Sequence, residues 1–178
     1  MALQYQCAMS LDGFIAGPGG DMGWMAEHLK PDPAADELMH ETGALLVGRR
    51  TFGGDDPYKG TENEGEPYGG GWAGPQFVLT HRIPEAPMPG VTFVDDLERA
   101  VAAAREAAGS KNVGVLGAQV AAQCLEAGLL DEIFVSVVPV LLGDGVRLFS
   151  HPGGPTFHLE PIRTTTDFGT SMLLRVVH

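Results

Sequence analysis

The chain has 178 residues, of which 44% are hydrophobic and 19% are charged, and its formal net charge at pH 7 is −12. This composition is that of one globular domain with a substantial core, and it excludes a disordered chain. The acidic charge, with no cluster of Lys and Arg to offset it, excludes a nucleic-acid backbone or an anionic membrane surface as an expected partner. An anionic small molecule would have to be held locally, by a few arginines and helix ends.

Three features of the sequence predict a cytoplasmic protein. The start, MALQYQC, has no basic segment followed by an apolar one, so we expect no signal peptide. The longest apolar run, near residues 133–143, is too short to span a bilayer and contains a proline. Cys7 and Cys124 lie in apolar segments without metal or redox spacing, which favours reduced thiols.

The first predicted elements are a strand at Leu3 to Met9 and, after an irregular glycine-rich loop, a short helix. Asp32 followed by a proline is a good pair for the N-cap and first turn of that helix. A buried strand at Ala44 to Val47 comes next and ends in Gly48 to Phe52. There Thr51 is a candidate cap for a further helix, with two arginines beside its first turn.

Residues 53–74 are dominated by glycine, acid and proline, and they are too polar to pack by themselves. We expect a mobile surface excursion. Its Tyr68 and Trp72 either fold over a pocket or anchor the segment to the body of the protein.

Strands are predicted at Gln76 to Thr80 and Val91 to Val94, and a helix follows them. Asp95 with Glu98 three residues later is a capping-box pattern, and Gly109 ends the helix. An apolar stripe on this helix consists of Leu97, Val101, Ala104 and Ala108.

The chain is organised around Val113 to Gly145, which reads as strand, glycine turn, helix and strand. A buried run ends at Leu116, Gly117 follows, and Ala118 to Ala127 has its apolar residues at helical spacing. Ile133 to Val138 is apolar and β-branched, so we predict a right-handed parallel crossover. In such units the helix N-terminus lies at the carboxyl edge of the sheet, where an anionic cofactor can dock. From these residues alone, a turn that only connects two elements is the alternative.

The tail holds two candidate strands, Thr156 to Thr166 and Thr170 to Val177, joined at residues 167–169. Strands with so short a joint are antiparallel. Alternating strands and helices followed by a hairpin predict an α/β fold with a mostly parallel central sheet and an antiparallel C-terminal hairpin.

Metal and nucleophile sites are not indicated. The histidines never fall at ligand spacing, there is no GxSxG motif, and neither cysteine has the setting of a nucleophile. Among the carboxylates, Asp32 is explained as a cap and Asp12 as a turn former. Asp36, a helical acid near the predicted pocket, is the least explained, although a solvated helix face is the alternative.

Six short motifs occur together and in order along nearly the whole chain. They are AMSLDGFIAG at Ala8 to Gly17, DMGW at Asp21 to Trp24, LLVGRRTF at Leu45 to Phe52, FVLTHR at Phe77 to Arg82, VLGAQVAAQCLEAGLLDEI at Val115 to Ile133 and VPVLLGDGVRLF at Val138 to Phe149. Together they resemble the dihydrofolate reductase-like family that includes the C-terminal reductase domain of the bacterial bifunctional riboflavin-pathway deaminase-reductase. The resemblance implies one domain over residues 1–178, with three layers and helices on both faces of the sheet.

The resemblance also implies a reductase that binds NADPH and a small-molecule substrate. Ala8 and Ile15 would contact the nicotinamide amide through their backbones. Three segments would hold the rest of the cofactor: Gly48, Arg49, Arg50 and Thr51 at the phosphates; Thr80, His81 and Arg82 at the adenosine ribose and its phosphate; and Leu116, Gly117, Ala118, Gln119 and Val120 at the pyrophosphate. The substrate would lie between Trp24, Asp36 and Phe52, with Asp36 as the candidate proton donor.

Two positions depart from the family pattern: Phe14 stands where the riboflavin-pathway domain usually has a lysine, and Ala118 where the turn often has a second glycine. The function that the resemblance implies is an NADPH-dependent reductase related to 5-amino-6-(5-phosphoribosylamino)uracil reductase, acting on a small heterocyclic, carbonyl or imine substrate. A pterin reductase and a non-catalytic nucleotide-binding protein are the alternatives. The family implies a homodimer, for which the apolar C-terminal hairpin offers an edge.

Overall fold

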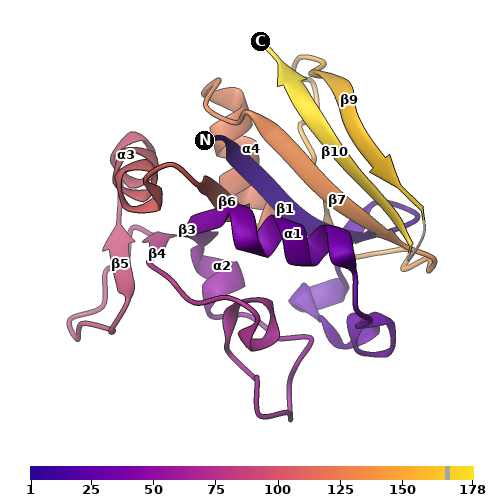
Figure 1. The fold of residues 1–178 in the computed structure, drawn as a ribbon, viewed down its shortest axis with the longest axis horizontal. Coiled ribbons are helices and arrows are strands. Elements are labelled where there is room, and N and C mark those ends of the chain that lie inside the picture. The colour runs from indigo at the N-terminus through magenta and orange to yellow at the C-terminus, as the bar shows by residue number, and fades with distance from the viewer. Residues whose placement is uncertain (167–168) are drawn as a thin grey trace.

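The computed structural model describes residues 1–166 and 169–178, which form one eight-stranded sheet with helices on both faces (Figure 1). The strands of this sheet are β1 (Leu3–Ser10), β3 (Thr42–Gly48), β4 (Gln76–Leu79), β5 (Val91–Val94), β6 (Asn112–Leu116), β7 (Glu132–Val138), β9 (His158–Thr165) and β10 (Thr170–Val177). Their order is β5-β4-β3-β6-β1-β7-β10-β9. The first six are parallel, whereas β10 is antiparallel to both β7 and β9. The predicted fold class is confirmed.

Helices and a second, small sheet complete the described structure. The helices are α1 (Pro33–Glu41), α2 (Arg49–Phe52), α3 (Leu97–Ala108) and α4 (Ala118–Glu126), with 3-10 turns η1 (Pro18–Gly20), η2 (Gly23–His28) and η3 (Pro67–Gly70). In the loop after β1, β2 (Phe14–Ala16) pairs antiparallel with β8 (Val146–Arg147). The predicted hairpin joint at residues 167–169 lies largely outside the described residues.

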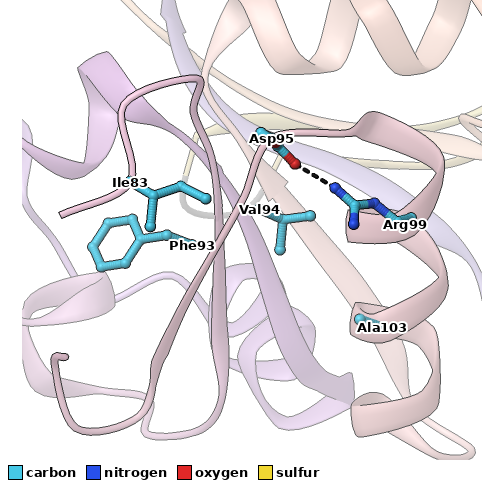
Figure 2. A pocket seen from close by; sticks show the side chains of 6 residues that line it. All are labelled: Ile83, Phe93, Val94, Asp95, Arg99 and Ala103. Atoms are coloured by element: carbon cyan, nitrogen blue, oxygen red, sulfur yellow. Dashed lines mark hydrogen bonds and ion pairs between the residues drawn. The ribbon is translucent and has the colours of Figure 1, made fainter. Parts of the chain in front are cut away.

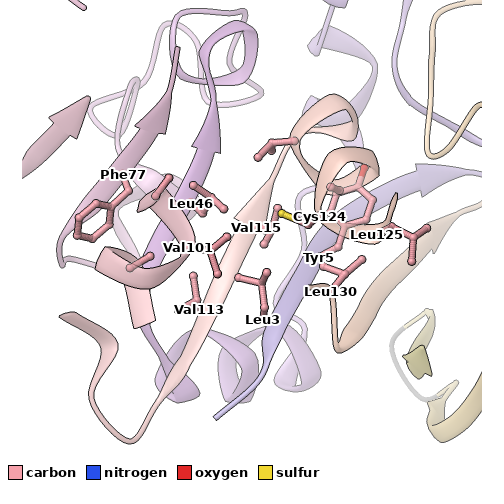
Figure 3. Close-up of a cluster of buried hydrophobic side chains, with 14 of the residues drawn as sticks. Leu3, Tyr5, Leu46, Phe77, Val101, Val113, Val115, Cys124, Leu125 and Leu130 are labelled. Carbon is pink, nitrogen blue, oxygen red and sulfur yellow. The ribbon is translucent and has the colours of Figure 1, made fainter. Parts of the chain in front are cut away.

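One face of the sheet carries an apolar core under α3 and α4 (Figure 3). Alternate residues of β1, such as Leu3 and Tyr5, point into it together with the buried side of α4, which includes Cys124. Helix α3 comes unusually close to β3, because Gly43 has no side chain: a Cβ there would lie 2.6 Å from the carbonyl oxygen of Ala108. Small residues on both elements therefore bring this layer together.

The opposite face is covered by α1 and by the end of the glycine-rich excursion. Trp72 is 8% exposed, and its indole Nε1 donates to the backbone oxygen of Thr42 at 2.9 Å. The Tyr68 hydroxyl donates to the side-chain oxygen of Gln6. Of the two alternatives for these aromatic residues, the structure shows anchoring to the body. The mobility of residues 53–74 stays a prediction.

Beneath Tyr68, a chain of amide hydrogen bonds crosses the sheet. Gln6 Nε2 donates to Gln4 Oε1 at 2.9 Å, and Gln4 Nε2 donates to Glu132 Oε2 at 2.9 Å. Gly114 makes room for this chain, since a Cβ there would lie 2.7 Å from Gln6 Oε1. At the end of this chain, the Gln6 side-chain oxygen keeps its donor only while Tyr68 stays in place, and a buried acceptor without a donor is costly.

Two predicted helix starts are corrected by the structure. Helix α3 is capped by Asp96, whose Oδ1 accepts from Arg99 N at 2.8 Å, and the capping box at Asp95 and Glu98 is wrong. The chain stays extended through Asp96, so the helix begins one residue later than the pattern indicates. Thr51 lies inside α2, whose N-cap is Gly48. The predicted cap at Asp32 is confirmed by its hydrogen bond from Ala34 N at 2.9 Å.

The C-terminal hairpin ends the sheet with a strand that pairs on one side only. Along β9 nearly every residue is exposed, including Leu159 and Ile162. Such an edge can pair with another chain. The homodimer nevertheless stays a prediction. Among the described residues, no helix has the length and apolarity needed to cross a bilayer, and no three His, Cys, Asp or Glu side chains gather as metal ligands would.

We expect Tyr68→Phe to lower the free energy of unfolding by about 1–3 kcal/mol, because it leaves the buried Gln6 oxygen without its donor. Tyr58→Phe is the matched control, since the Tyr58 hydroxyl makes no hydrogen bond within the described chain. That change should stay within about 0.5 kcal/mol of wild type. Urea unfolding measures both, and equal losses would contradict the role of the Tyr68 hydroxyl.

Candidate functional site

The predicted cofactor segments all leave the same edge of the sheet. Val47 of β3 lies in register with Leu116 of β6, and Gly48 lies in register with Leu79 of β4. The residues that follow these strands, in α2, at Thr80 and at Gly117, therefore emerge side by side at the carboxyl edge. In parallel sheets this edge is where ligands bind.

Gly117 is the tightest point of this arrangement. Its φ of +105° favours glycine, and a Cβ at this position would lie 2.4 Å from Thr51 Oγ1 and 3.9 Å from Gly48 N. A Cβ on Gly48 would lie 3.5 Å from Val120 Cγ1. The structure thus brings four predicted phosphate residues close together, at a turn where only glycine fits.

Helix α4 begins at this turn without a side-chain cap. The N-termini of α1 and α3 each receive an aspartate oxygen, from Asp32 and Asp96, whereas Gly117 offers none to α4. The first N–H groups of a helix need acceptors and carry partial positive charge. This N-terminus can accept an anion at the edge where the predicted phosphate residues meet.

The arginines divide into two groups by their partners. Those paired with carboxylates lie on α3, β9 and β10: Arg99, Arg105, Arg163 and Arg175. Those with no carboxylate partner within the described chain lie on segments that leave the carboxyl ends of strands: Arg49, Arg50, Arg82 and Arg147. In so acidic a chain, cations left without a carboxylate at one edge favour an anionic ligand there.

A shallow hollow of about 420 Å³ lies beside the predicted adenosine segment (Figure 2). Its lining comes from β5, α3 and the loop after β4: Ile83, Phe93, Val94, Asp95, Arg99 and Ala103. Thr80 N donates to Val94 O at 2.8 Å, which joins this hollow to Thr80, His81 and Arg82. His81 and Arg82 are exposed, as a ligand contact in an open groove requires.

The predicted nicotinamide residues lie further along the edge. Ala8 is in β1, in register with Ser136 of β7, and Ile15 is half-buried in β2. The turn between β1 and β2 is fixed because Phe14 N donates to Ser10 Oγ at 3.0 Å. A hydrogen bond from Ser10 and two from backbone N–H groups of the loop after β7 lower the pKa of Asp12 to about 2. Asp12 is therefore an ionised anchor for that loop, in line with its prediction as a turn former.

The predicted substrate residues are less closely grouped. Phe52 packs edge-on against Phe93 with ring centres 5.8 Å apart. Trp24 lies in η2, and its indole N–H is buried with no hydrogen-bond partner in the described chain. Asp36 is exposed on α1 and makes no side-chain hydrogen bond or ion pair with the described residues. Its role as proton donor stays a prediction.

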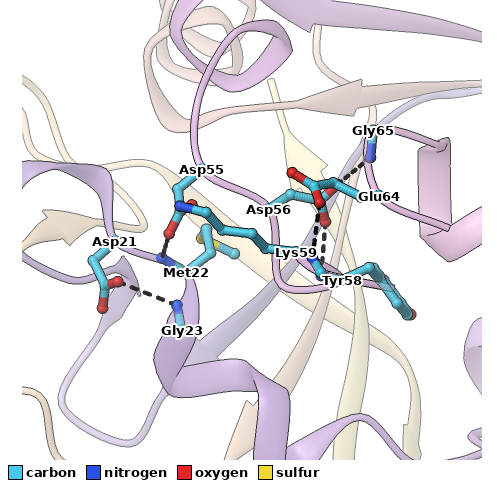
Figure 4. Close-up of polar contacts among 10 residues, drawn as sticks. Asp21, Met22, Gly23, Asp55, Asp56, Tyr58, Lys59, Glu64 and Gly65 are labelled. Carbon is cyan, nitrogen blue, oxygen red and sulfur yellow. Dashed lines mark hydrogen bonds and ion pairs between the residues drawn. The ribbon is translucent and has the colours of Figure 1, made fainter. Parts of the chain in front are cut away.

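The loop that carries Trp24 is tied to the glycine-rich excursion (Figure 4). Asp55 accepts from Met22 N at 3.1 Å and from Lys59 Nζ at 3.1 Å. Both bonds lower the pKa of Asp55, that from Met22 most. The excursion thus braces the loop beside the predicted substrate region.

A carboxylate that sequence reasoning assigned only to capping has a second set of partners. Asp32 Oδ2 accepts from Ser171 Oγ at 3.3 Å, and the hydroxyls of Ser171 and Ser136 lie 2.9 Å apart. Ser136 is the strand neighbour of Ala8. The sequence offered one indication of this cluster, which is Ser136 inside the otherwise apolar run IFVSVV. The structure therefore places Asp32, and not Asp36, in a polar cluster beside the end of β1.

The cysteines do not add a nucleophile to this site. Burial raises the pKa of Cys7 and of Cys124 to about 12, so both are neutral thiols at ordinary pH.

The eight-stranded, mostly parallel sheet with its antiparallel C-terminal strands is that of an α/β protein of the dihydrofolate reductase-like class. The sequence model of the RibD C-terminal domain family matches residues 2–173. The chain therefore belongs to the RibD C-terminal (reductase) domain family, which confirms the resemblance. The family includes NADPH-dependent pyrimidine reductases.

Three individual proteins are similar to this chain. YwjB of Bacillus subtilis, an uncharacterized protein, is 25% identical over 172 residues, covering 96% of this chain and 94% of its own. A Shewanella sp. PV-4 protein named for riboflavin biosynthesis has a structure with a TM-score of 0.75 at 25% identity, with 100% of both chains covered. A Thermotoga maritima diaminohydroxyphosphoribosylaminopyrimidine deaminase/5-amino-6-(5-phosphoribosylamino)uracil reductase has a TM-score of 0.66 at 19% identity, covering 99% of this chain and 56% of that one.

We expect Gly117→Ala to weaken NADPH binding roughly tenfold or more, because the new methyl group would fill the turn and displace its N–H groups from a phosphate. Gly128→Ala is the control. Gly128 also has positive φ, +67°, but a Cβ there would meet nothing within 4 Å. Fluorescence titration with NADPH should show the loss for Gly117→Ala only. Equal affinities in two folded variants would remove this turn from the cofactor site.

Proposed function

We propose that the protein is an NADPH-dependent reductase that acts on a small heterocyclic, carbonyl or imine substrate. One observation carries the proposal: α4 begins uncapped at Gly117, against Thr51, at an edge where Arg49, Arg50 and Arg82 have no carboxylate partner in the described chain. A dinucleotide phosphate group would satisfy both the N–H groups and the arginines.

The residues present fit the cofactor. Gly117 to Val120 would hold the pyrophosphate, and Arg49 and Arg50 would neutralise its charge. Thr80, His81 and Arg82 would hold the adenosine ribose and its phosphate, and Ala8 and Ile15 would position the nicotinamide amide. When bound, the nicotinamide supplies a hydride to the substrate.

The chain itself would orient the substrate and supply a proton. The loop of Trp24 would exclude water from the region beside β1, whereas Phe52 packs against Phe93 of β5. Asp32, flanked by the hydroxyls of Ser136 and Ser171, would accept hydrogen bonds from ring N–H or amino groups and deliver a proton. This set of acceptors suits an aminopyrimidine, and it equally suits the pterin of the alternative function.

We expect the protein to reduce 5-amino-6-(5-phosphoribosylamino)uracil or a dihydropterin with NADPH. One equivalent of NADPH should be oxidised for each equivalent of product formed. Loss of the reduced-nicotinamide absorbance measures the reaction. NADPH that binds but is oxidised by no member of this panel would favour the non-catalytic alternative. Absence of NADPH binding would refute the proposal.

We expect Asp32→Asn to lower kcat roughly a hundredfold while the Kd for NADPH changes little, because a general acid typically contributes 10²–10⁴-fold. Asparagine keeps the helix cap, so the change isolates the carboxylate. Asp36→Asn is the matched control on the same helix and should retain activity within about twofold. The opposite ranking of the two variants would restore Asp36 as the proton donor.

A further inference from the structure

A cation at the carboxyl edge remains outside the roles described so far. Arg147 belongs to β8, and its guanidinium carbon lies 4.6 Å from the ring centre of Phe14 on β2. Phe14 is 5% exposed, whereas Arg147 is exposed. The ring is therefore a buried surface under the guanidinium, whose side chain stays exposed to solvent.

The carboxylates nearest in sequence to the two small strands are engaged elsewhere. Both oxygens of Asp12 accept from backbone N–H groups, those of Leu142 and Gly143, at 3.0 and 2.7 Å. Asp144 Oδ1 accepts from Gly145 N at 2.8 Å. Arg147 consequently has no carboxylate partner within the described chain, although acidic residues outnumber basic ones 23 to 11.

The position of Arg147 separates it from the predicted cofactor cations. Arg49, Arg50 and Arg82 follow β3 and β4, whereas the β2–β8 pair is attached to the ends of β1 and β7. Leu11 N donates to Val140 O at 2.9 Å and Leu148 N donates to Gly13 O at 2.9 Å, which bind this small sheet to the turn after β1. Strand β6 lies between the strands that carry the two groups of arginines. A dinucleotide whose phosphates bind at the ends of β3 and β6 would not occupy Arg147. This arginine would then be available to a different anion.

We propose that Arg147, supported by Phe14, binds an anionic group of the substrate, a phosphate or a carboxylate. This inference rests on the proposed function, because it assigns the substrate to the region beside β1. A guanidinium placed against an aromatic ring can offer its planar fork of N–H donors to such a group. The substrate class is then a small acidic heterocycle rather than a neutral one.

Two matched ligand pairs test the proposal without requiring turnover. Ribose 5-phosphate against ribose reports on a phosphate, and dihydrofolate against its neutral dimethyl ester reports on a carboxylate. Both pairs are titrated, by NMR at one ionic strength, into the protein with NADPH present. Wild type should bind the charged member of at least one pair about tenfold or more tightly than its neutral member.

Arg147→Gln should remove that preference and leave binding of the neutral member within about twofold. Arg147→Lys should restore part of it, since the charge returns without the fork. Arg175→Gln is the control for a remote loss of charge and should keep the preference, because Arg175 lies on β10 in an ion pair with Glu160. If Arg147 only braces the small sheet, Arg147→Gln will lower the midpoint of thermal unfolding and weaken both members equally.

Equal binding of charged and neutral members by wild type overturns the proposal, as does a preference that survives Arg147→Gln. Failure of the proposed function has a different signature. In that case NADPH is not oxidised by any member of the substrate panel, while Arg147 still discriminates between the members of a pair.

Discussion

The arrangement of the whole edge depends on the insertion of β1 between β6 and β7. These two strands are joined through α4, yet the N-terminal strand separates them and is in parallel register with both. Backbone and side-chain bonds secure it, among them Leu3 N to Asp131 Oδ2 at 2.7 Å and Asp131 N to Leu3 O at 2.9 Å. Because of this insertion, the turn after β1 and the turn at Gly117 open on the same edge, although about a hundred residues separate them.

The two faces of the sheet are stabilised by different interactions. Under α3 and α4 the core is apolar and needs only close packing. On the other face, Gln4, Gln6 and Glu132 bring polar groups beneath α1 and the glycine-rich excursion. The Tyr68 hydroxyl completes this chain by donating to the Gln6 side-chain oxygen, and burial raises its pKa, so the group stays a neutral donor. The excursion is therefore part of the folded body where it carries Tyr68 and Trp72.

Charge is distributed unevenly over this acidic protein. The arginines of α3, β9 and β10 are paired with carboxylates, and those at the carboxyl edge have none among the described residues. A surface pair contributes little to stability, whereas a cation without a partner is available to a ligand. The function proposed for the edge and the role proposed for Arg147 both follow from this distribution.

Local sequence pattern determined most strands of the main sheet and several helix ends, but it misplaced the caps of α2 and α3 and did not indicate β2. Apolar β-branched runs indicated the strands, Asp32 and Gly109 indicated helix ends, and Gly117 indicated the turn at the carboxyl end of β6, because each depends on neighbours within a few residues. Only the tertiary structure decided which carboxylate joins a polar cluster and which arginine lacks a partner. The second role of Asp32 needs Ser136 and Ser171, which lie more than a hundred residues further along the chain. Such contacts depend on strand order and register, and no short window of sequence contains them.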